Sequence, residues 1–200
     1  MAHSFSDNFD GWYKYAERNR TKPPRPLLTR AMGFVERRDA AIDIGSGGLN
    51  DTRYLLDSGF AQVTALDGEP VAQADADTLP PERFTYTIAK FEDYAFPPAA
   101  FDLVNAQYAL PFIRPERFSQ VFAAILASLR AGGVLTGQFF GDRDDWAGTP
   151  NMTFHAQADA KILLEPLTMV EWTEEDDVTG TTLSGQPKHW HLFHFIARHP

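Results

Sequence analysis

The sequence predicts an α/β fold: a doubly wound, mostly parallel sheet of seven strands that ends in an antiparallel hairpin. Two observations predict it. Short apolar runs alternate with helical segments from about residue 40 to residue 140, which is typical of a parallel sheet covered by helices on both faces. Beyond residue 165, two strand-like segments flank a connection without a helical pattern, so we expect them to pair antiparallel.

The expected elements follow from apolar periodicity and turn residues. Strands are expected over residues 41–44, 62–67, 84–90, 101–106 and 134–140, with hairpin strands over 167–172 and 190–197. Helices are expected over residues 27–37, 50–58 and 115–129, the last with an apolar stripe and ended by Ala131-Gly132-Gly133. Pro23, Pro24 and Pro26 are expected to stop any helix before the first of these. We interpret the acidic run 174–177 as a solvated loop tip.

Composition limits the classes of partner. The chain has 200 residues, 16 Phe and no Cys, which allows one domain with a large core and excludes disulfides, thiolate zinc sites and cysteine nucleophiles. A net charge of −9 argues against nucleic acid. No apolar run reaches membrane-spanning length, and the polar start of the chain lacks the hydrophobic core of a signal peptide. We therefore expect a cytoplasmic monomer or homodimer without a membrane partner, with residues 1–38 as an aromatic lid segment and helix and residues 39–200 as the main domain.

A glycine-rich turn follows the first strand. Asp43-Ile44-Gly45-Ser46-Gly47 closes that strand, and Asp67 closes the next one at the spacing typical of a nucleotide-binding strand-turn-helix-strand unit. Glycines let the backbone approach a ligand, and a carboxylate accepts strong hydrogen bonds from a ribose diol. An ordinary tight turn is the simpler reading of the glycines alone. The position of Asp67 favours a cofactor that contains a nucleoside.

These residues resemble the class I S-adenosylmethionine-dependent methyltransferases. The resemblance rests on the glycine turn, on Asp67, on residues 101–110 (FDLVNAQYAL) and on residues 128–135 (SLRAGGVL). The chain resembles more loosely the small bacterial branch near the tellurite-resistance and thiopurine methyltransferases. The chain departs from many members at Leu49, where they have a third glycine.

The resemblance implies a Rossmann-like fold and S-adenosylmethionine as the cofactor. It implies that the methionine part lies against Asp43, Gly45, Ser46 and Gly47, the ribose against Asp67 and Gly68, the adenine against Phe91 and Glu92, and the sulfonium near Ala106. Asp93 is an almost equal alternative to Glu92.

The reaction implied is an in-line methyl displacement, in which much of the acceleration comes from aligning the acceptor, so a base is optional. Tyr13, Gln107 and Tyr108 are the candidate catalytic residues. Trp12, Tyr15, Asn105 and Trp146 are further candidates for acceptor contacts, although core packing explains Tyr108 and Trp146 equally well.

Two charged groups have simpler interpretations. Arg18, Arg20, Lys22 and Arg25 could supply a cation for the cofactor's carboxylate, but a solvated basic loop explains each one more simply. His189, His191 and His194 are not expected to bind a metal, because a strand sends the first two to one face and the third to the other.

The sequence thus predicts a methyltransferase that acts on a small molecule. A non-catalytic S-adenosylmethionine-binding protein remains an alternative, because fold alone does not establish turnover. A nicotinamide-dependent oxidoreductase is a second alternative, although its fingerprint requires a glycine where this chain has Asn50.

Overall fold

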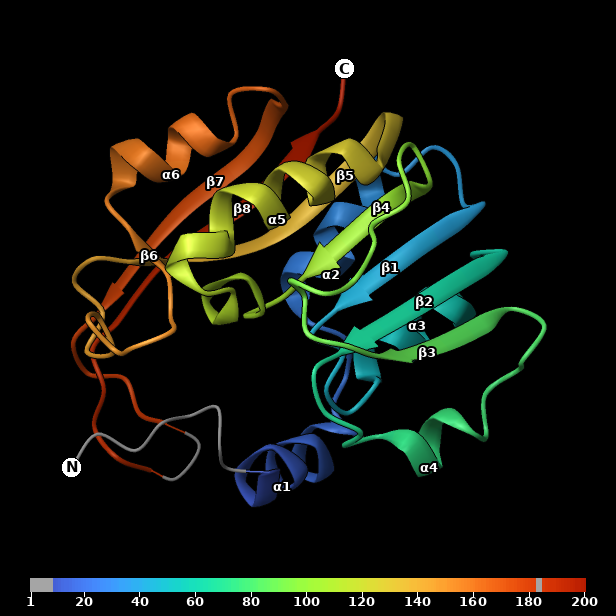
Figure 1. Ribbon diagram of the computed structural model, residues 1–200, viewed down its shortest axis with the longest axis horizontal. Coiled ribbons are helices and arrows are strands. Elements are labelled where there is room, and N and C mark those ends of the chain that lie inside the picture. The colour runs from blue at the N-terminus through green and yellow to red at the C-terminus, as the bar shows by residue number, and fades with distance from the viewer. Residues whose placement is uncertain (1–8, 183–184) are drawn as a thin grey trace.

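A mixed sheet forms the centre of the molecule (Figure 1). The structure, a computed structural model, describes residues 9–182 and 185–200. The strand order is β3-β2-β1-β4-β5-β8-β7, and the short β6 pairs with β5 off this path. The strands are β1 (Ala40–Ile44), β2 (Gln62–Asp67), β3 (Phe84–Ile88), β4 (Phe101–Ala106), β5 (Leu129–Gly141), β6 (Phe154–His155), β7 (Thr168–Asp177) and β8 (Trp190–Arg198).

The helices cover both faces of this sheet (Figure 1). They are α1 (Phe9–Asn19), α2 (Pro26–Ala31), α3 (Asn50–Asp57), α4 (Gln73–Ala76), α5 (Pro115–Ser128) and α6 (Gln157–Leu163), with 3-10 turns η2 (Met32–Phe34) and η3 (Leu110–Phe112). The helices α5 and α6 cover one face, while α2 and α3 cover the other.

The predicted topology is confirmed. Strands β1 to β5 run parallel, whereas β8 is antiparallel to both β5 and β7. Two strands, 62–67 and 101–106, have the expected bounds, and β3 ends two residues early at Ile88. The strand β8 is buried along most of its length, as its apolar residues on both faces predict.

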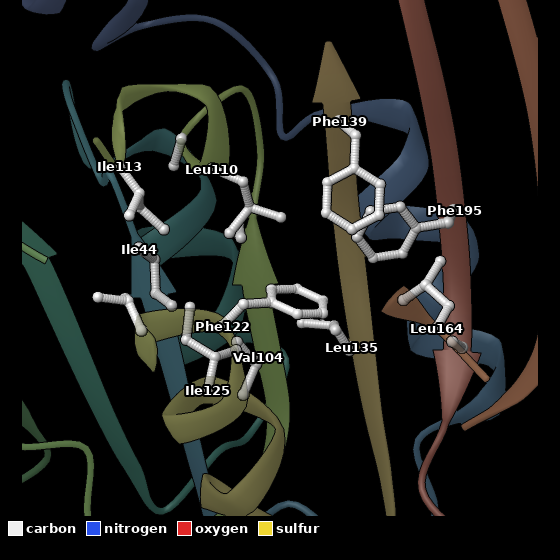
Figure 2. Packing of buried hydrophobic residues seen from close by; sticks show 14 of the residues in the cluster. Ile44, Val104, Leu110, Ile113, Phe122, Ile125, Leu135, Phe139, Leu164 and Phe195 are labelled. Carbon is white, nitrogen blue, oxygen red and sulfur yellow. The ribbon is translucent and has the colours of Figure 1, made fainter. Parts of the chain in front are cut away.

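Two apolar clusters hold the layers together. On one face, Phe122 and Ile125 of α5 pack over Leu135 and Phe139 of β5, as Figure 2 shows. On the other face, Leu28 of α2 and the leucines of α3 pack against the sheet. Because the central strands are covered on both sides, their backbone is rigid and their carboxyl ends are held in fixed register.

The helix expected over residues 27–37 is shorter and begins earlier. Pro26 does not stop the helix but starts it, because the first helical position needs no N–H donor and favours the fixed φ of proline. The α-helix ends at Ala31, and residues 32–34 form a 3-10 turn around Gly33, a residue of low helix propensity.

The expected stop after α5 is also wrong. The residues Ala131-Gly132-Gly133 lie inside β5, which begins directly at Leu129. Gly132 has a φ of +78°, and the pairing of β4 with β5 shifts register between Phe101 and Leu103. The two glycines therefore form an irregular start of a strand rather than a helix cap.

The acidic run Glu174–Asp177 is not a loop tip, because it forms the end of β7. Its side chains pair with cations of the neighbouring segments: Glu174 and Asp176 both accept hydrogen bonds from Arg143. These ion pairs tie the acidic end of β7 to the turn after β5.

The helix α1 lies at the carboxyl ends of the parallel strands, on the side to which their arrowheads point (Figure 1). The sequence did not predict α1, α4, α6 or β6 as elements. Residues 1–8, part of the expected lid segment, lie outside the described residues. No helix in the described part of the chain has both the length and the apolarity needed to cross a bilayer.

Candidate functional site

The glycine turn is tied to the end of the neighbouring strand. The backbone N–H of Gly45 donates to the carbonyl of Leu66 at 2.7 Å, and that of Ser46 donates to the same oxygen at 3.3 Å. Gly45 and Gly47 have φ values of +70° and +48°, a region that side chains rarely adopt. A Cβ at Gly45 would also lie 2.7 Å from the Cβ of Ala109. Only glycine fits this turn at Gly45.

Asp67 lies at the end of β2 and faces this turn. Its carboxylate accepts hydrogen bonds from the N–H of Gly47 at 2.8 Å and of Glu69 at 3.1 Å. Burial raises the pKa of Asp67, and these two donors act in the opposite direction. Beside it, a Cβ on Gly68 would meet no atom within 4 Å. The end of β2 thus presents a carboxylate next to open space.

Asp43 points inward, away from the turn that it precedes. Its carboxyl accepts hydrogen bonds from the Thr52 hydroxyl at 2.6 Å and from the Asn105 amide at 2.8 Å. The same amide reaches Asp51 at 3.2 Å, so one NH₂ group bridges two buried carboxyls. Burial, reinforced by the nearby charge of Asp51, raises the pKa of Asp43 to about 7. Asp43 therefore orders the loop and the start of α3.

Ser46 is buried in the middle of the glycine turn. Its side-chain Oγ is inaccessible to solvent and has no hydrogen-bond partner among the described residues. A buried hydroxyl without a partner costs free energy, so this position favours a bound polar group.

The residues that follow β3 and β4 adjoin the turn from the other side. The Phe91 ring lies 3.7 Å from the position of a Cβ on Gly45. Glu92 accepts a hydrogen bond from the backbone N–H of Arg114 at 3.2 Å, at the start of α5. Ala106 is buried at the end of β4. Phe91 thus borders the glycine turn, whereas Glu92 is bound to the start of α5.

The candidate acceptor-side residues follow β4 directly. Gln107 is buried and donates to the Asn105 side-chain oxygen at 2.9 Å. Tyr108 has a φ of +57°, an uncommon conformation for a residue with a side chain. Its N–H donates to the side-chain oxygen of Gln138 at 2.8 Å.

Arg25 reaches this group from the N-terminal side. Its guanidinium lies over the Tyr108 ring, 4.7 Å from the centroid, and donates to the Tyr15 hydroxyl at 2.6 Å. Its backbone N–H donates to Asp51 at 2.8 Å. For Arg25 the interpretation as part of a solvated loop is therefore wrong, because specific partners fix its guanidinium next to the site.

The helix α1 covers the glycine turn. The Tyr15 ring lies 3.5 Å from the Cβ position of Gly47, and a Cβ on Gly48 would lie 2.6 Å from the carbonyl oxygen of Ala16. The Trp12 ring meets the Phe112 ring edge-on at 5.2 Å. These contacts bring Trp12 and Tyr15 toward the ends of β1 and β4.

Tyr13 lies on another side of α1 and is 46% exposed. It lines a cavity of about 260 Å³ between α1, Gly48 and the segment 70–75. Small-molecule sites commonly measure about 300–1,000 Å³, so this cavity is just below the usual range. It adjoins the glycine turn but includes neither Gln107 nor Tyr108 among its lining residues. Tyr13 and the other two candidate catalytic residues therefore do not line one cavity.

The three histidines each pair with a separate carboxylate of β7. His189 lies 2.5 Å from Asp176, and His191 lies 3.0 Å from Glu174. His194 lies 2.8 Å from Glu175. In the described part of the chain, no group of three His, Asp or Glu residues is arranged to hold a metal ion.

Two features were missed from the sequence. Lys188 is buried, ion-paired with Asp144, and lies between the Trp146 and Trp190 rings at 4.2 and 4.0 Å. Burial lowers the pKa of Lys188, and Asp144 opposes that shift. Trp146, a candidate acceptor contact, therefore packs on a lysine of its own chain.

The second missed feature is a chain of buried amides that crosses the sheet. It runs from Asn105 through Gln107 to Gln138 and ends at His194. A signal was present: Asn105 and Gln107, like Thr136 and Gln138, are polar residues two positions apart at the ends of apolar runs. Alternate positions of a strand share a face, so such pairs are expected to meet between neighbouring strands.

Part of the chain matches known methyltransferases in sequence. Residues 42–136 match the family model described as a methyltransferase domain. A segment of 93 residues is 33% identical to an uncharacterized methyltransferase of Synechocystis sp. and covers 46% of this chain. That match spans 43% of the Synechocystis protein, less than half of its length.

Two solved structures share the fold. The Burkholderia thailandensis 1,6-didemethyltoxoflavin-N1-methyltransferase, solved with 1,6-didemethyltoxoflavin and S-adenosylhomocysteine, aligns over 100% of this chain and 90% of its own, with a TM-score of 0.71 and 21% identity. TehB from Haemophilus influenzae aligns over 93% of this chain and 66% of its own, with a TM-score of 0.74 and 15% identity. The expected Rossmann-like fold is confirmed.

Proposed function

We propose that this chain, whose residues 42–136 match a methyltransferase domain, is a class I S-adenosylmethionine-dependent enzyme that transfers a methyl group to a small-molecule acceptor. The observation that supports this most directly is the pairing of Asp67 with the glycine turn. The carboxylate and the turn adjoin each other at the carboxyl ends of β1 and β2, where open α/β sheets bind ligands.

The residues present fit the cofactor. The Ser46 hydroxyl is buried without a partner in the described chain, so a polar group of the methionine part would satisfy it. The Asp67 carboxylate accepts backbone donors such as the N–H groups of Gly47 and Glu69, and its remaining lone pairs would accept hydrogen bonds from the ribose hydroxyls. Gly68 leaves space beside it. Phe91, next to Gly45, would contact the adenine side.

Arg25 is the candidate cation for the cofactor's carboxylate. Tyr15 and the Tyr108 ring hold its guanidinium beside the glycine turn, so little side-chain entropy would be lost on binding. Arg20, by contrast, is about half exposed and lies 3.8 Å from Asp75.

When bound, S-adenosylmethionine supplies a methyl group already activated by a sulfonium sulfur. Gln107 and Tyr108, which follow β4, would orient the acceptor in line with it, and alignment alone contributes much of the acceleration. The helix α1, with Trp12 and Tyr15 over the turn, would exclude water as a lid. The comparison with the toxoflavin enzyme supports a small acceptor, as does the net charge of −9, which disfavours nucleic acid.

The test is calorimetry with S-adenosylhomocysteine on the wild type and on Asp67→Ala. We expect the substitution to cost about 1.5–3 kcal/mol of binding free energy, typical of lost hydrogen bonds to a charged acceptor. Asp57→Ala is the matched control, because Asp57 is an exposed carboxylate at the end of α3. If the wild type and both variants bind S-adenosylhomocysteine with equal affinity, the ribose does not bind at Asp67.

A further inference from the structure

Gln138 holds both residues after β4, Gln107 and Tyr108. It lies on β5, is 1% exposed, and uses both ends of its amide. Its oxygen accepts the N–H of Tyr108 at 2.8 Å, and its nitrogen donates to the Gln107 oxygen at 2.8 Å. A buried amide with such partners fixes the atoms that it binds.

The bond to Tyr108 stabilises an unfavourable backbone. A left-handed conformation is unfavourable for a residue with a side chain, because its Cβ crowds the following carbonyl oxygen. With a φ of +57°, Tyr108 directs its N–H toward the Gln138 oxygen. An apolar residue at position 138 would leave this N–H without that partner, so the conformation of Tyr108 depends on the amide.

The direction of the amide chain follows from the carboxyls at its end. Asn105 donates its NH₂ to Asp43 and Asp51, so its oxygen faces Gln107 and must accept. Gln107 therefore presents its own oxygen to Gln138. Each amide is oriented by the one before it, and such aligned bonds strengthen one another.

At the other end of the amide chain, the His194 ring accepts a hydrogen bond. The Gln138 nitrogen also lies 3.3 Å from Nδ1 of His194, whose Nε2 faces Glu175 at 2.8 Å. With Nδ1 accepting, Nε2 carries the hydrogen and donates to the carboxylate. His194 and Glu175 thus anchor Gln138 from the side opposite to Gln107.

We propose that Gln138 is a positioning residue for methyl transfer: its amide holds the Gln107 side chain and the Tyr108 backbone in the orientation that faces the reacting methyl group. This rests on the proposed function, which places the methyl beside the end of β4. Gln138 acts through these two residues and does not itself contact the cofactor.

Sinefungin tests this without a known acceptor. This analogue of S-adenosylmethionine carries a protonated amine in place of the methyl, so its affinity depends on the polar groups that face the acceptor side. The affinity for S-adenosylhomocysteine, which has no group at that place, depends only on the rest of the site. In Gln138→Met, we expect the dissociation constant for S-adenosylhomocysteine to stay within about twofold and that for sinefungin to rise about tenfold, the equivalent of about 1.4 kcal/mol. Gln62→Met, at an exposed position of β2, is the matched control and should change neither.

A double-mutant cycle separates positioning from general damage. If Gln138 acts through Gln107, the double variant Gln107→Met/Gln138→Met should bind sinefungin no more weakly than the weaker of the two single variants. Gln138→Asn, one methylene shorter, is the gentler variant should Gln138→Met fail to fold; we expect a smaller loss in the same direction.

Three results would contradict the proposed role of Gln138. Equal weakening of both analogues, no change in either, or additive losses in the cycle would each overturn the role of Gln138. A wild type that binds neither analogue would instead overturn the proposed function.

Discussion

At the residue scale, the most unusual group is the buried carboxyl pair below the glycine turn. Asp43 and Asp51 share one Asn105 amide, and Arg25 lies 3.8 Å from Asp51 as the nearby cation. Two buried carboxyls so close together favour retention of a proton. The acid that opens the glycine motif is therefore a structural group whose charge depends on pH near neutrality.

We expect this proton to appear in the stability of the protein. The pKa of Asp43 rises from 3.8 to about 7 on folding, because burial disfavours its charged form. Between these values the folded state binds more protons than the unfolded chain, so the contribution of Asp43 to stability is complete at low pH and is lost as the pH rises through 7. Relative to Asp43→Asn, the wild type should lose up to about 1.4 kcal/mol of unfolding free energy per pH unit from about pH 5.5 to 7.

Urea denaturation at a series of pH values measures this difference. Above about pH 8, Asp43 is deprotonated in both the folded and the unfolded state. The free energies of unfolding of the wild type and of Asp43→Asn should then depend on pH in the same way. Asp57→Asn, at an exposed carboxylate, is the control. A constant difference between wild type and Asp43→Asn from pH 5.5 to 8 would mean that Asp43 is ionised throughout.

At the scale of elements, α1 packs closely on the glycine turn at Gly48. The backbone of α1 and the residue after it come so close to Gly48 that a Cβ there would lie 2.6 Å from the Ala16 oxygen and 2.8 Å from the Arg20 nitrogen. Both atoms belong to the backbone, so they can move only with the helix. Gly48, and not the missing third glycine at Leu49, sets the distance between helix and turn.

Gly48→Ala should therefore detach α1. Overpacking costs about 1–3 kcal/mol, which raises the population of the open form about 5- to 150-fold. Tryptic cleavage at Arg18 and Arg20 should accelerate by a similar factor. S-adenosylhomocysteine should protect these sites in the wild type, if α1 is a lid, and protect them less in the variant.

Gly33→Ala is the matched control, because a Cβ at Gly33 meets no atom within 4 Å and its φ is not left-handed. If S-adenosylhomocysteine does not slow the cleavage of the wild type, α1 is not a lid. Unchanged cleavage of Gly48→Ala would show that α1 is not held at the turn.

At the scale of the whole molecule, the sheet and the N-terminal helix meet at the proposed binding site. The turn after β1, Asp67 at the end of β2 and the residues after β4 converge, and α1 covers the turn from the N-terminal side. Under the proposed function, a ligand bound at this convergence would stabilise the folded state as a whole, because the unfolded chain has no such site.

Thermal unfolding distinguishes the cofactor classes. At about 100 times its dissociation constant, S-adenosylhomocysteine should add about 2.7 kcal/mol, which corresponds to roughly 5–10 °C for a chain of this size. NADH at the same concentration should leave the midpoint unchanged, and Asp67→Ala should reduce the shift. A shift with NADH alone would favour the oxidoreductase alternative.

The sequence by itself determined the order of the seven main strands and of the helices α2, α3 and α5, the glycine turn and the position of Asp67. These features depend on residues close together in the chain: apolar periodicity sets the element type, and turn geometry selects glycine. It failed at element edges, where Pro26 starts a helix and the glycines at 132 and 133 enter a strand, because neighbours in space decide those cases.

Only the tertiary structure decided the contacts of the side chains around the site. Gln138 meets Gln107 across 31 residues of sequence and His194 across 56, and Arg25 lies over a ring 83 positions away. A hydrogen bond or a ring contact extends over a few ångströms, so such partners depend on strand register and on which helix covers which face. A local sequence pattern does not specify which residues of two strands lie opposite each other. The amide chain across the sheet could therefore be identified only from the pairing of the strands in the structure.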